Sequence, residues 1–220
     1  MKHRGEKPKT SRLNSKPSVY GGKVQKKGKQ GYHEENSMNI ELIPAQEKDF
    51  SVVQNLIRFY VYDMSEFMGW SCPESGLYGG VDDQPEYWGR KPSNLQDCWP
   101  QGWVGFPYVI RVDGTLGGFV LIQQKDQNGE AIYDVGEFFI LRKIRGKGVG
   151  KTVAHRIFDQ YPGQWEVRQL VQNKPAQHFW RAVISQYGDG RYQESREIDA
   201  HHHCAMVVQR FNSSRINQNS

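Results

Sequence analysis

From residue 38 to residue 64, apolar side chains first alternate with polar ones and then recur every three or four residues. Residues 38–44 (MNIELIP) alternate apolar and polar side chains, as does a strand with one buried face. Over residues 50–64 the apolar positions recur every three or four residues, which predicts a long amphipathic helix, and Asp49 stands where a capping side chain belongs. The pattern therefore predicts a strand followed by a helix.

Three strands joined by tight turns are predicted in the middle of the chain. Residues 106–112 and 116–123 flank Asp113-Gly114, a pair typical of a two-residue hairpin turn, and residues 126–129 lead into a further strand at 131–141. We expect these three strands to be antiparallel. Residues 65–105 contain many Gly, Pro and Trp with little periodicity, which predicts loops between the first helix and the hairpin.

The last third of the chain alternates helices and strands. A helix with an apolar face is predicted from Val149 to Phe158, and a strand follows at residues 164–171. Asn173-Lys174-Pro175 resembles a helix start, because Asn is a good cap and Pro suits the first turn. Two further strands are predicted at residues 192–198 and 204–211.

Charge is distributed unevenly along the chain. The 220 residues include 29 Lys and Arg against 24 Asp and Glu, but residues 1–33 hold ten of the basic residues and one acid. Because residues 1–37 have few large apolar side chains, we predict a disordered basic tail, which is either a solvated extension or an arm that binds nucleic acid. The folded domain is predicted at residues 38–212 and a frayed end at 213–220.

Several classes of protein are disfavoured by composition. No run approaches the roughly 20 apolar residues of a membrane span, and no apolar segment follows the N-terminal charges as in a secretory signal. The three cysteines are scattered without a CxxC spacing, which favours neither a disulfide framework nor a zinc site. The internal run His201-His202-His203 is predicted to be a solvated strand edge. We therefore expect a cytoplasmic protein with no metal and no membrane partner.

A glycine-rich turn precedes the helix at Val149. Free amides at a helix start carry the positive end of its dipole, and glycine lets an anion approach closely, so the turn suits a phosphate. A P-loop, G-x-x-x-x-G-K-(S/T), would need Gly where Arg145 stands, and the dinucleotide pattern G-x-G-x-x-G fails because the glycines fall at 146, 148 and 150. Glycine that serves turn geometry alone stays an alternative.

Two motifs together indicate a family. The turn matches (Q/R)-x-x-G-x-(G/A) through Arg145, Gly148 and Gly150. The following helix matches N-x-x-A-x-x-(F/L)-(Y/W) through Asn173, Ala176, Phe179 and Trp180. Over about residues 39–211 the sequence resembles the GNAT superfamily of acyl-CoA-dependent N-acyltransferases. The resemblance implies an α+β fold with a mixed, mostly antiparallel central sheet and helices on both faces.

The resemblance also implies acetyl-CoA as the acyl donor, bound between two splayed strands. The backbone of Phe138, Phe139 and Ile140 would pair with the pantetheine arm. The pyrophosphate would rest on a set of turn residues: Arg145, Gly146, Lys147, Gly148, Val149, Gly150 and Lys151. Asn173 would contact the cofactor arm, cap its helix, or do both.

Amine acetylation needs a base, a group that polarises the thioester carbonyl, and a proton for the thiolate. By the resemblance Glu137 is the base; alternatively it binds substrate or pairs with an arginine. We expect the rings of Phe138, Phe139 and Phe179 to surround it with apolar groups, which favours a base. The main-chain amide near Ile140 would polarise the carbonyl.

The sequence departs from the family pattern at the position of the general acid, because Trp180 stands where relatives often carry Tyr. Indole does not donate a useful proton, so Tyr187 or Tyr133 is a stand-in acid, or CoA leaves as the thiolate. Two further strand acids, Asp134 and Glu166, are either surface charges or site residues, and surface charges are favoured.

The acceptor is indicated only by composition. Acids gather in residues 62–99 among Trp70, Trp88, Trp99 and Trp103, which either pack or form a pocket for a cationic amine. The predicted function is transfer of an acetyl group to a primary amine, with a small cationic amine favoured, by direct attack in a ternary complex. A protein or peptide N-acetyltransferase and a non-catalytic CoA-binding regulatory module are the alternatives, and association into a homodimer stays open.

Overall fold

One sheet organises the part of the chain that the structure describes. The structure is a computed structural model and describes residues 38–78, 104–127, 129–199 and 203–214. Within these residues seven strands follow the order β1-β2-β3-β4-β5-β7-β6. Their bounds are β1 Ile40–Pro44, β2 Val104–Val112, β3 Thr115–Gln127, β4 Glu130–Ile140, β5 Gln164–Leu170, β6 Gln193–Ile198 and β7 Ala205–Asn212.

The helices lie between these strands in the chain. They are α1 (Phe50–Met68), α3 (Val149–Gln160) and α4 (Lys174–Gly188), and two short 3-10 turns occupy Glu47–Asp49 and Arg142–Ile144. No helix of the described residues has the length and apolar character that a membrane crossing requires. Within the described residues the predicted succession of strands and helices is confirmed. The predicted tail at residues 1–37 and most of the predicted frayed end at 213–220 lie outside the described part of the chain.

The sheet is mixed, as predicted. Neighbours from β1 to β4 are antiparallel, as are β5 with β7 and β7 with β6. Only β4 and β5 run parallel among the described strands, because α3 carries the chain back across the sheet between them. The hairpin turn at Asp113-Gly114 is also confirmed, and both residues have the positive φ that a two-residue turn requires (50° and 73°).

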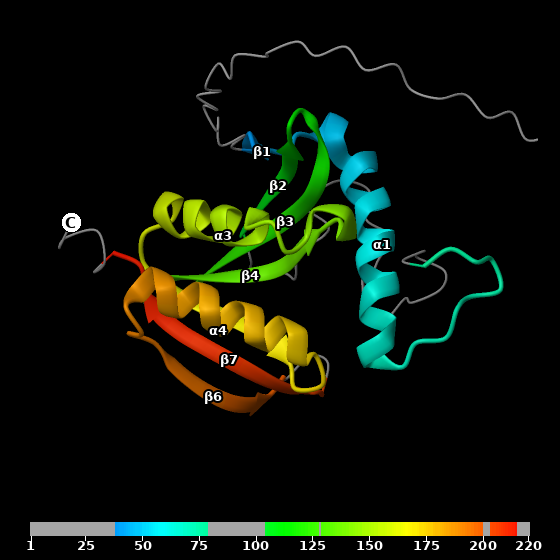
Figure 1. Ribbon diagram of the computed structural model, residues 1–220. Coiled ribbons are helices and arrows are strands. Elements are labelled where there is room, and N and C mark those ends of the chain that lie inside the picture. The colour runs from blue at the N-terminus through cyan, green and yellow to red at the C-terminus, as the bar shows by residue number, and fades with distance from the viewer. Residues whose placement is uncertain (1–37, 79–103, 128, 200–202, 215–220) are drawn as a thin grey trace, which may run out of the picture. The chain divides into compact units, whose positions relative to one another are not determined.

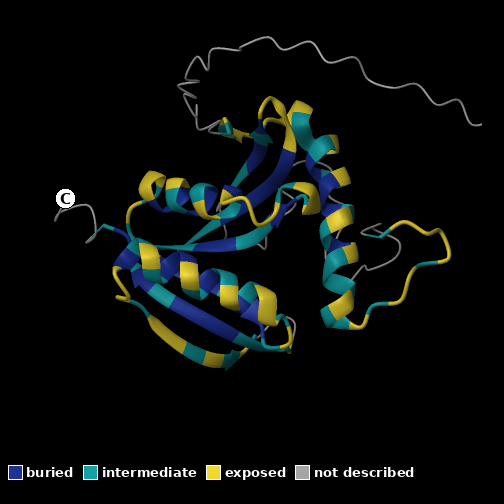
Figure 2. Ribbon diagram, in the orientation of Figure 1, coloured by how far each residue is buried: buried dark blue, intermediate teal, exposed yellow. Residues whose placement is uncertain are grey.

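Alternating side chains divide the core into two layers. Tyr108 and Ile110 of β2 pack with α3 and α4, whereas Val109 between them packs with α1. The sheet therefore has α1 on one face and α3 with α4 on the other, which confirms helices on both faces. Figure 1 shows α3 and α4 together on one side of the sheet, and Figure 2 shows their buried stripes facing it.

The start and end of α1 differ from the sequence expectation. Asp49 stands at the N-cap position of α1, but its side chain makes no capping bond to that helix and accepts the Gln46 amide at 3.0 Å instead. The helix also continues to Met68 and ends at Gly69, which adopts φ 70°. Asp63 and Met64, near the C-terminal end of this helix, contact residues that follow β4 and β5.

Candidate active site

The site begins where the two parallel strands separate. β4 and β5 pair only through Ile132 with Gln164, Tyr133 with Trp165, and Asp134 with Glu166, although β4 continues to Ile140. Immediately beyond, β4 carries a bulge: Val135 lies opposite Ile122 and Glu137 opposite Leu121, so Gly136 is an extra residue. The bulge bends β4, and its last residues keep their ladder to β3 alone among the described strands.

Space is limited at the bulge, which suits glycine. A Cβ built at Gly136 would lie 3.0 Å from Nε2 of Gln123 and 3.3 Å from the Leu121 carbonyl oxygen. The Gln123 side chain therefore lies over the backbone of Gly136. A larger residue would press on this flexible side chain and on the Leu121 carbonyl.

The glycine turn follows at the C-terminal end of β4. Gly146 and Gly148 adopt φ values of 77° and 81°, which L side chains rarely adopt, and a Cβ on either would meet nothing within 4 Å. Gly148 is the N-cap of α3, and the first amides of a helix have no acceptor within the helix itself. Such amides, at the positive end of the helix dipole, fit a pyrophosphate.

The remaining turn residues take different positions. Lys147 and Lys151 are exposed beside the turn, whereas Val149 is a core residue, 1% exposed, and offers only its amide. Gly150 has a different requirement from its neighbours: a Cβ there would lie 3.1 Å from Cζ of Phe179 on α4. Gly150 thus allows the close approach of α3 and α4.

Arg145 is directed toward α1. Its Nη2 donates to Asp63 Oδ2 at 2.6 Å, its Nε donates to the Ile140 carbonyl at 2.6 Å, and its guanidinium lies 5.2 Å from the centre of the Phe139 ring. Arg142 binds the other oxygen of the same carboxylate at 2.6 Å, and this hydrogen bond raises the pKa of Arg142. The hydrogen bonds of Arg145 to the Ile140 carbonyl and to Asp63 attach it to β4 and to α1.

Asn173 caps α4, as one of the two predicted roles requires. Its Oδ1 accepts the Ala176 amide at 3.0 Å, and its Nδ2 lies 3.9 Å from Sδ of Met64. The N-termini of α3 and α4 both follow the C-terminal ends of the separating strands, so Asn173 lies across the strand opening from the glycine turn. Its contact with a cofactor stays a prediction.

Glu137 lies on the α1 face of the sheet. It pairs with Leu121, whose side chain packs with α1, and the same layer contains Phe139 two residues on. Phe138 and Phe179 belong to the opposite layer, so the expectation that they flank Glu137 is wrong. Glu137 is partly buried, and its Oε2 is enclosed. Its pairing with Leu121 places it on the side of β4 away from α3 and α4.

The structure does not bring the predicted acid candidates to Glu137. Trp180 is 5% exposed and packs against Phe138, Phe158 and Phe179 on the α3 and α4 side of the sheet. Tyr187 lies two turns further along α4, and its hydroxyl donates to Asp159, near the end of α3, at 2.8 Å. Burial and this hydrogen bond raise the pKa of Tyr187. Tyr133 packs against the Tyr161 and Trp165 rings.

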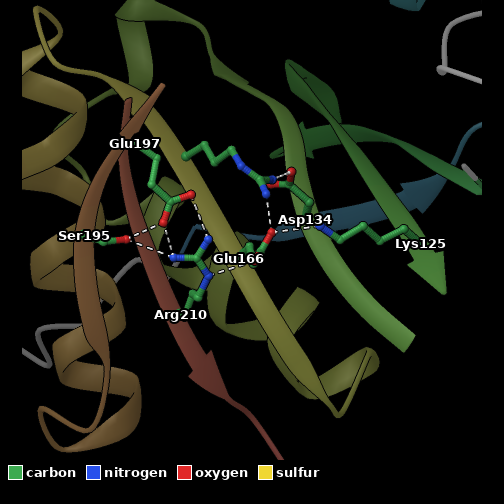
Figure 3. A network of polar contacts seen from close by, with 7 residues as sticks. Lys125, Asp134, Glu166, Ser195, Glu197 and Arg210 are labelled. Atoms are coloured by element: carbon green, nitrogen blue, oxygen red, sulfur yellow. Dashed lines mark hydrogen bonds and ion pairs between the residues drawn. The ribbon is translucent and has the colours of Figure 1, made fainter. Parts of the chain in front are cut away.

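Two acids expected at the surface are buried. Asp134 and Glu166 are 4% and 8% exposed and lie at the last paired position of β4 and β5. Arg168 bridges them, while Glu166 also accepts from Lys125 at 3.2 Å and from Arg210 at 2.8 Å. Figure 3 shows this network continuing through Arg210 to Ser195 and Glu197 on β6. The expectation failed because neighbouring strands supply the opposite charges.

Burial and partners change the pKa of the two acids in opposite directions. Burial raises the pKa of Asp134 to about 6, even though Arg168 opposes the effect. Burial also acts on Glu166, but hydrogen bonding from Arg210 and the charge of Arg168 outweigh it, so the pKa of Glu166 is lowered. The network is thus a structural ion cluster at the last paired position of β4 and β5, where the two strands begin to separate.

The histidine run and most of the predicted acceptor region are only partly described. His203 lies in the turn before β7 with φ 50° rather than in a strand, and His201 and His202 lie outside the described residues. No metal-ligand cluster of His, Cys, Asp or Glu occurs within the described ranges. Trp70 packs beside the α1 layer, whereas Trp88, Trp99 and Trp103 fall in the segment 79–103, outside the described residues.

Comparisons with known proteins agree with this geometry. The family model described as the acetyltransferase (GNAT) family matches residues 76–183, which include the bulge, the glycine turn and most of α4. A comparison with curated protein sequences finds no match.

Solved structures share the fold at low sequence identity. An aminoglycoside N(6')acetyltransferase from Legionella pneumophila is 12% identical, with a TM-score of 0.54 over 82% of this chain and 96% of that one. A chimera of spermidine N-acetyltransferase SpeG from Vibrio cholerae and hSSAT is 12% identical, with a TM-score of 0.51 over 82% of this chain and 99% of that one. These likenesses establish the fold.

Proposed function

The chain belongs to the GNAT acetyltransferase family and is an acyltransferase, and we propose from that premise that it acetylates a small cationic primary amine. The acetyl donor in this proposal is acetyl-CoA. The observation that carries the donor part of the proposal is the glycine turn at the end of β4, where Gly146 and Gly148 adopt positive φ beside the start of α3. This turn lies next to the place where β4 and β5 cease to pair.

The chain's own groups fit the donor at two places. The amides of the turn and of the first turn of α3 would hold the pyrophosphate, with Lys147 and Lys151 exposed nearby to add positive charge. The backbone of Phe138–Ile140 would bind the pantetheine arm along the edge of β4 that faces away from β3. Acetyl-CoA supplies an activated thioester when bound.

Glu137 would accept the proton of the amine. It lies on the α1 face of β4, so the acceptor would approach from the side opposite to α3 and α4. A protonated amine would first lose one proton to water. Attack of the neutral amine would then form the C–N bond and break the C–S bond, and the remaining excess proton on nitrogen would pass to Glu137. Because Trp180 and Tyr187 are engaged elsewhere, we propose that the thiolate leaves without a side-chain acid and takes its proton from solvent.

A cationic acceptor is supported by charge and by analogy. The sequence places acids and tryptophans together in residues 62–99. The two solved relatives named above are titled for an aminoglycoside and for spermidine, which supports an amine acceptor in general. The preference for a small cationic amine over a peptide rests on the composition alone.

Calorimetric titration with acetyl-CoA tests the donor site through two matched variants. Asn and Asp tolerate a left-handed conformation better than other side chains, so Gly148→Asn and Gly148→Asp differ mainly in charge. We expect Gly148→Asp to bind acetyl-CoA on the order of 10-fold more weakly than Gly148→Asn, because its carboxylate would lie beside the pyrophosphate. Equal affinity of the two variants, or no binding by folded wild type, would refute the donor site.

A free-thiol assay then tests the acceptor. Spermidine, an aminoglycoside, a peptide with a free N-terminus and an anionic amino acid form the panel. Turnover with the first two and little with the others is expected. Preference for the peptide would replace the small-amine proposal with the protein or peptide N-acetyltransferase.

A further inference from the structure

A carboxylate on α1 binds two arginines that precede the glycines of the turn. Asp63 binds Arg142 through Oδ1 and Arg145 through Oδ2, each at 2.6 Å, and its side chain is 16% exposed. The two arginine side chains are 65% and 43% exposed, so the carboxylate is the enclosed member of the group. One helix of the opposite layer thus reaches the segment that begins the donor turn.

Arg145 links Asp63 to the backbone of β4. Its Nε donates to the carbonyl of Ile140, the last residue of β4, while its Nη2 donates to Asp63. The guanidinium also lies over the Phe139 ring at 5.2 Å, where the π face favours a cation. Arg145 therefore has a single orientation fixed by three groups, and Asp63 supplies the charged one.

The neighbouring residue of α1 touches the other side of the strand opening. Sδ of Met64 lies 3.9 Å from Nδ2 of Asn173, the residue that caps α4. Consecutive residues of one helix consequently contact the segments that follow β4 and β5. This arrangement braces the two sides at a fixed separation, because α1 is a continuous helix through both positions.

We propose that Asp63 is a positioning residue for the donor site and acts through Arg145. It holds the end of β4 and the first residue of the glycine turn in the arrangement that receives acetyl-CoA. The inference rests on the proposed function and assigns Arg145 a partner within the chain.

The first measurement is calorimetric affinity for acetyl-CoA in Asp63→Asn, with Glu66→Gln as the matched control. Glu66 is exposed one turn further along α1, so its substitution removes an equal charge from the same helix. We expect Asp63→Asn to bind about 10-fold more weakly, Asp63→Glu to retain most of the affinity, and Glu66→Gln to match wild type. Unchanged or tighter binding in Asp63→Asn would overturn the proposal, and tighter binding would indicate that Arg145 binds phosphate once Asp63 releases it.

A double variant tests whether the effect passes through Arg145. If it does, Asp63→Asn adds little to the loss already caused by Arg145→Gln. Additive losses would overturn this route. Thermal unfolding of each variant, with Asp63→Glu as the variant that preserves the charge, separates weaker binding from a smaller folded fraction.

Hydrogen exchange without acetyl-CoA separates this inference from the proposed function. Faster amide exchange of residues 141–150 in Asp63→Asn than in Glu66→Gln is expected, because the turn loses its anchor. Equal exchange would overturn the positioning role. If wild type fails to bind acetyl-CoA, the proposed function fails, and the exchange result still decides whether Asp63 positions the turn.

Discussion

Gly148 and Gly150 lie two residues apart, yet the structure gives each a different reason for being glycine. At Gly148 the backbone is left-handed, with φ 81°, and the space around a Cβ is open. At Gly150 the backbone is helical, but a Cβ would lie 3.1 Å and 3.2 Å from two ring carbons of Phe179. Replacing each by alanine therefore tests backbone strain and crowding separately.

The expected magnitudes differ because one substitution has an offsetting gain. A left-handed L residue costs about 1–2 kcal/mol, and Gly148→Ala gains no contact to compensate, so it should lower the free energy of unfolding by about that amount. Gly150→Ala gains up to about 1 kcal/mol in helix propensity. The loss from pressing a methyl group onto Phe179 is about 1 kcal/mol, at the low end for overpacking. The second variant should be close to wild type in stability.

Urea denaturation followed by tryptophan fluorescence measures both values on the same scale. Gly150→Val serves as the crowding control, since its two additional methyl groups meet the same ring and should cost about 1–3 kcal/mol. If Gly148→Ala is as stable as wild type, the left-handed conformation of residue 148 is refuted. If Gly150→Val is also tolerated, α3 and α4 are not in the close contact described.

Three further predictions concern the proton chemistry and the ion cluster. Glu137→Gln should lower kcat by about 100-fold with an unchanged acetyl-CoA affinity by calorimetry, and an unchanged kcat would remove Glu137 as the base. Trp180→Phe should cost about 1–2 kcal/mol of stability because it leaves a gap in the aromatic cluster, while steady-state kcat stays near wild type; a large fall in kcat would show that this cluster positions the active site. Since the folded pKa of Asp134, about 6, exceeds the ordinary 3.8, its charge is unfavourable above pH 6 and protonation stabilises the fold as pH falls. Asp134→Asn should thus be more stable than wild type at pH 7.5 by up to about 3 kcal/mol, with a gap that closes toward pH 4 in urea denaturation. Glu166→Gln, whose carboxyl has a lowered pKa, is the control and should lose stability at pH 7.5; a loss in Asp134→Asn as well would mean that the Arg168 ion pair outweighs burial.

Much of the fold could be predicted because its signals are local. The hairpin at Asp113-Gly114 needs only two adjacent residues that accept positive φ, and the structure has both. Asn173 could be placed at the start of α4 because a cap bonds to an amide three residues away in the same segment. The cap at the start of α1 was less predictable, because the Asp49 carboxylate accepts a hydrogen bond from the Gln46 amide instead of one from α1.

The candidate site was predicted less completely, because several of its contacts join distant segments. Nothing in the spacing of Asp63 and Arg145 indicates that they meet, since 82 residues separate them. The burial of Asp134 and Glu166 depends likewise on which strands lie beside β4 and β5. An unusual density of alternating acids and bases on strands that end near one another is the only sequence signal that could have indicated this cluster.

The sequence by itself determined the order of strands and helices, the glycine turn and the cap of α4, because each depends on interactions within a few residues. The tertiary structure alone decided which face of the sheet carries Glu137. The bulge at Gly136 shifts the alternation of β4 by one residue, so that Glu137 points to the α1 face and Phe138 to the other. Such a shift arises from pairing with β3, a strand whose register the residues of β4 do not specify alone.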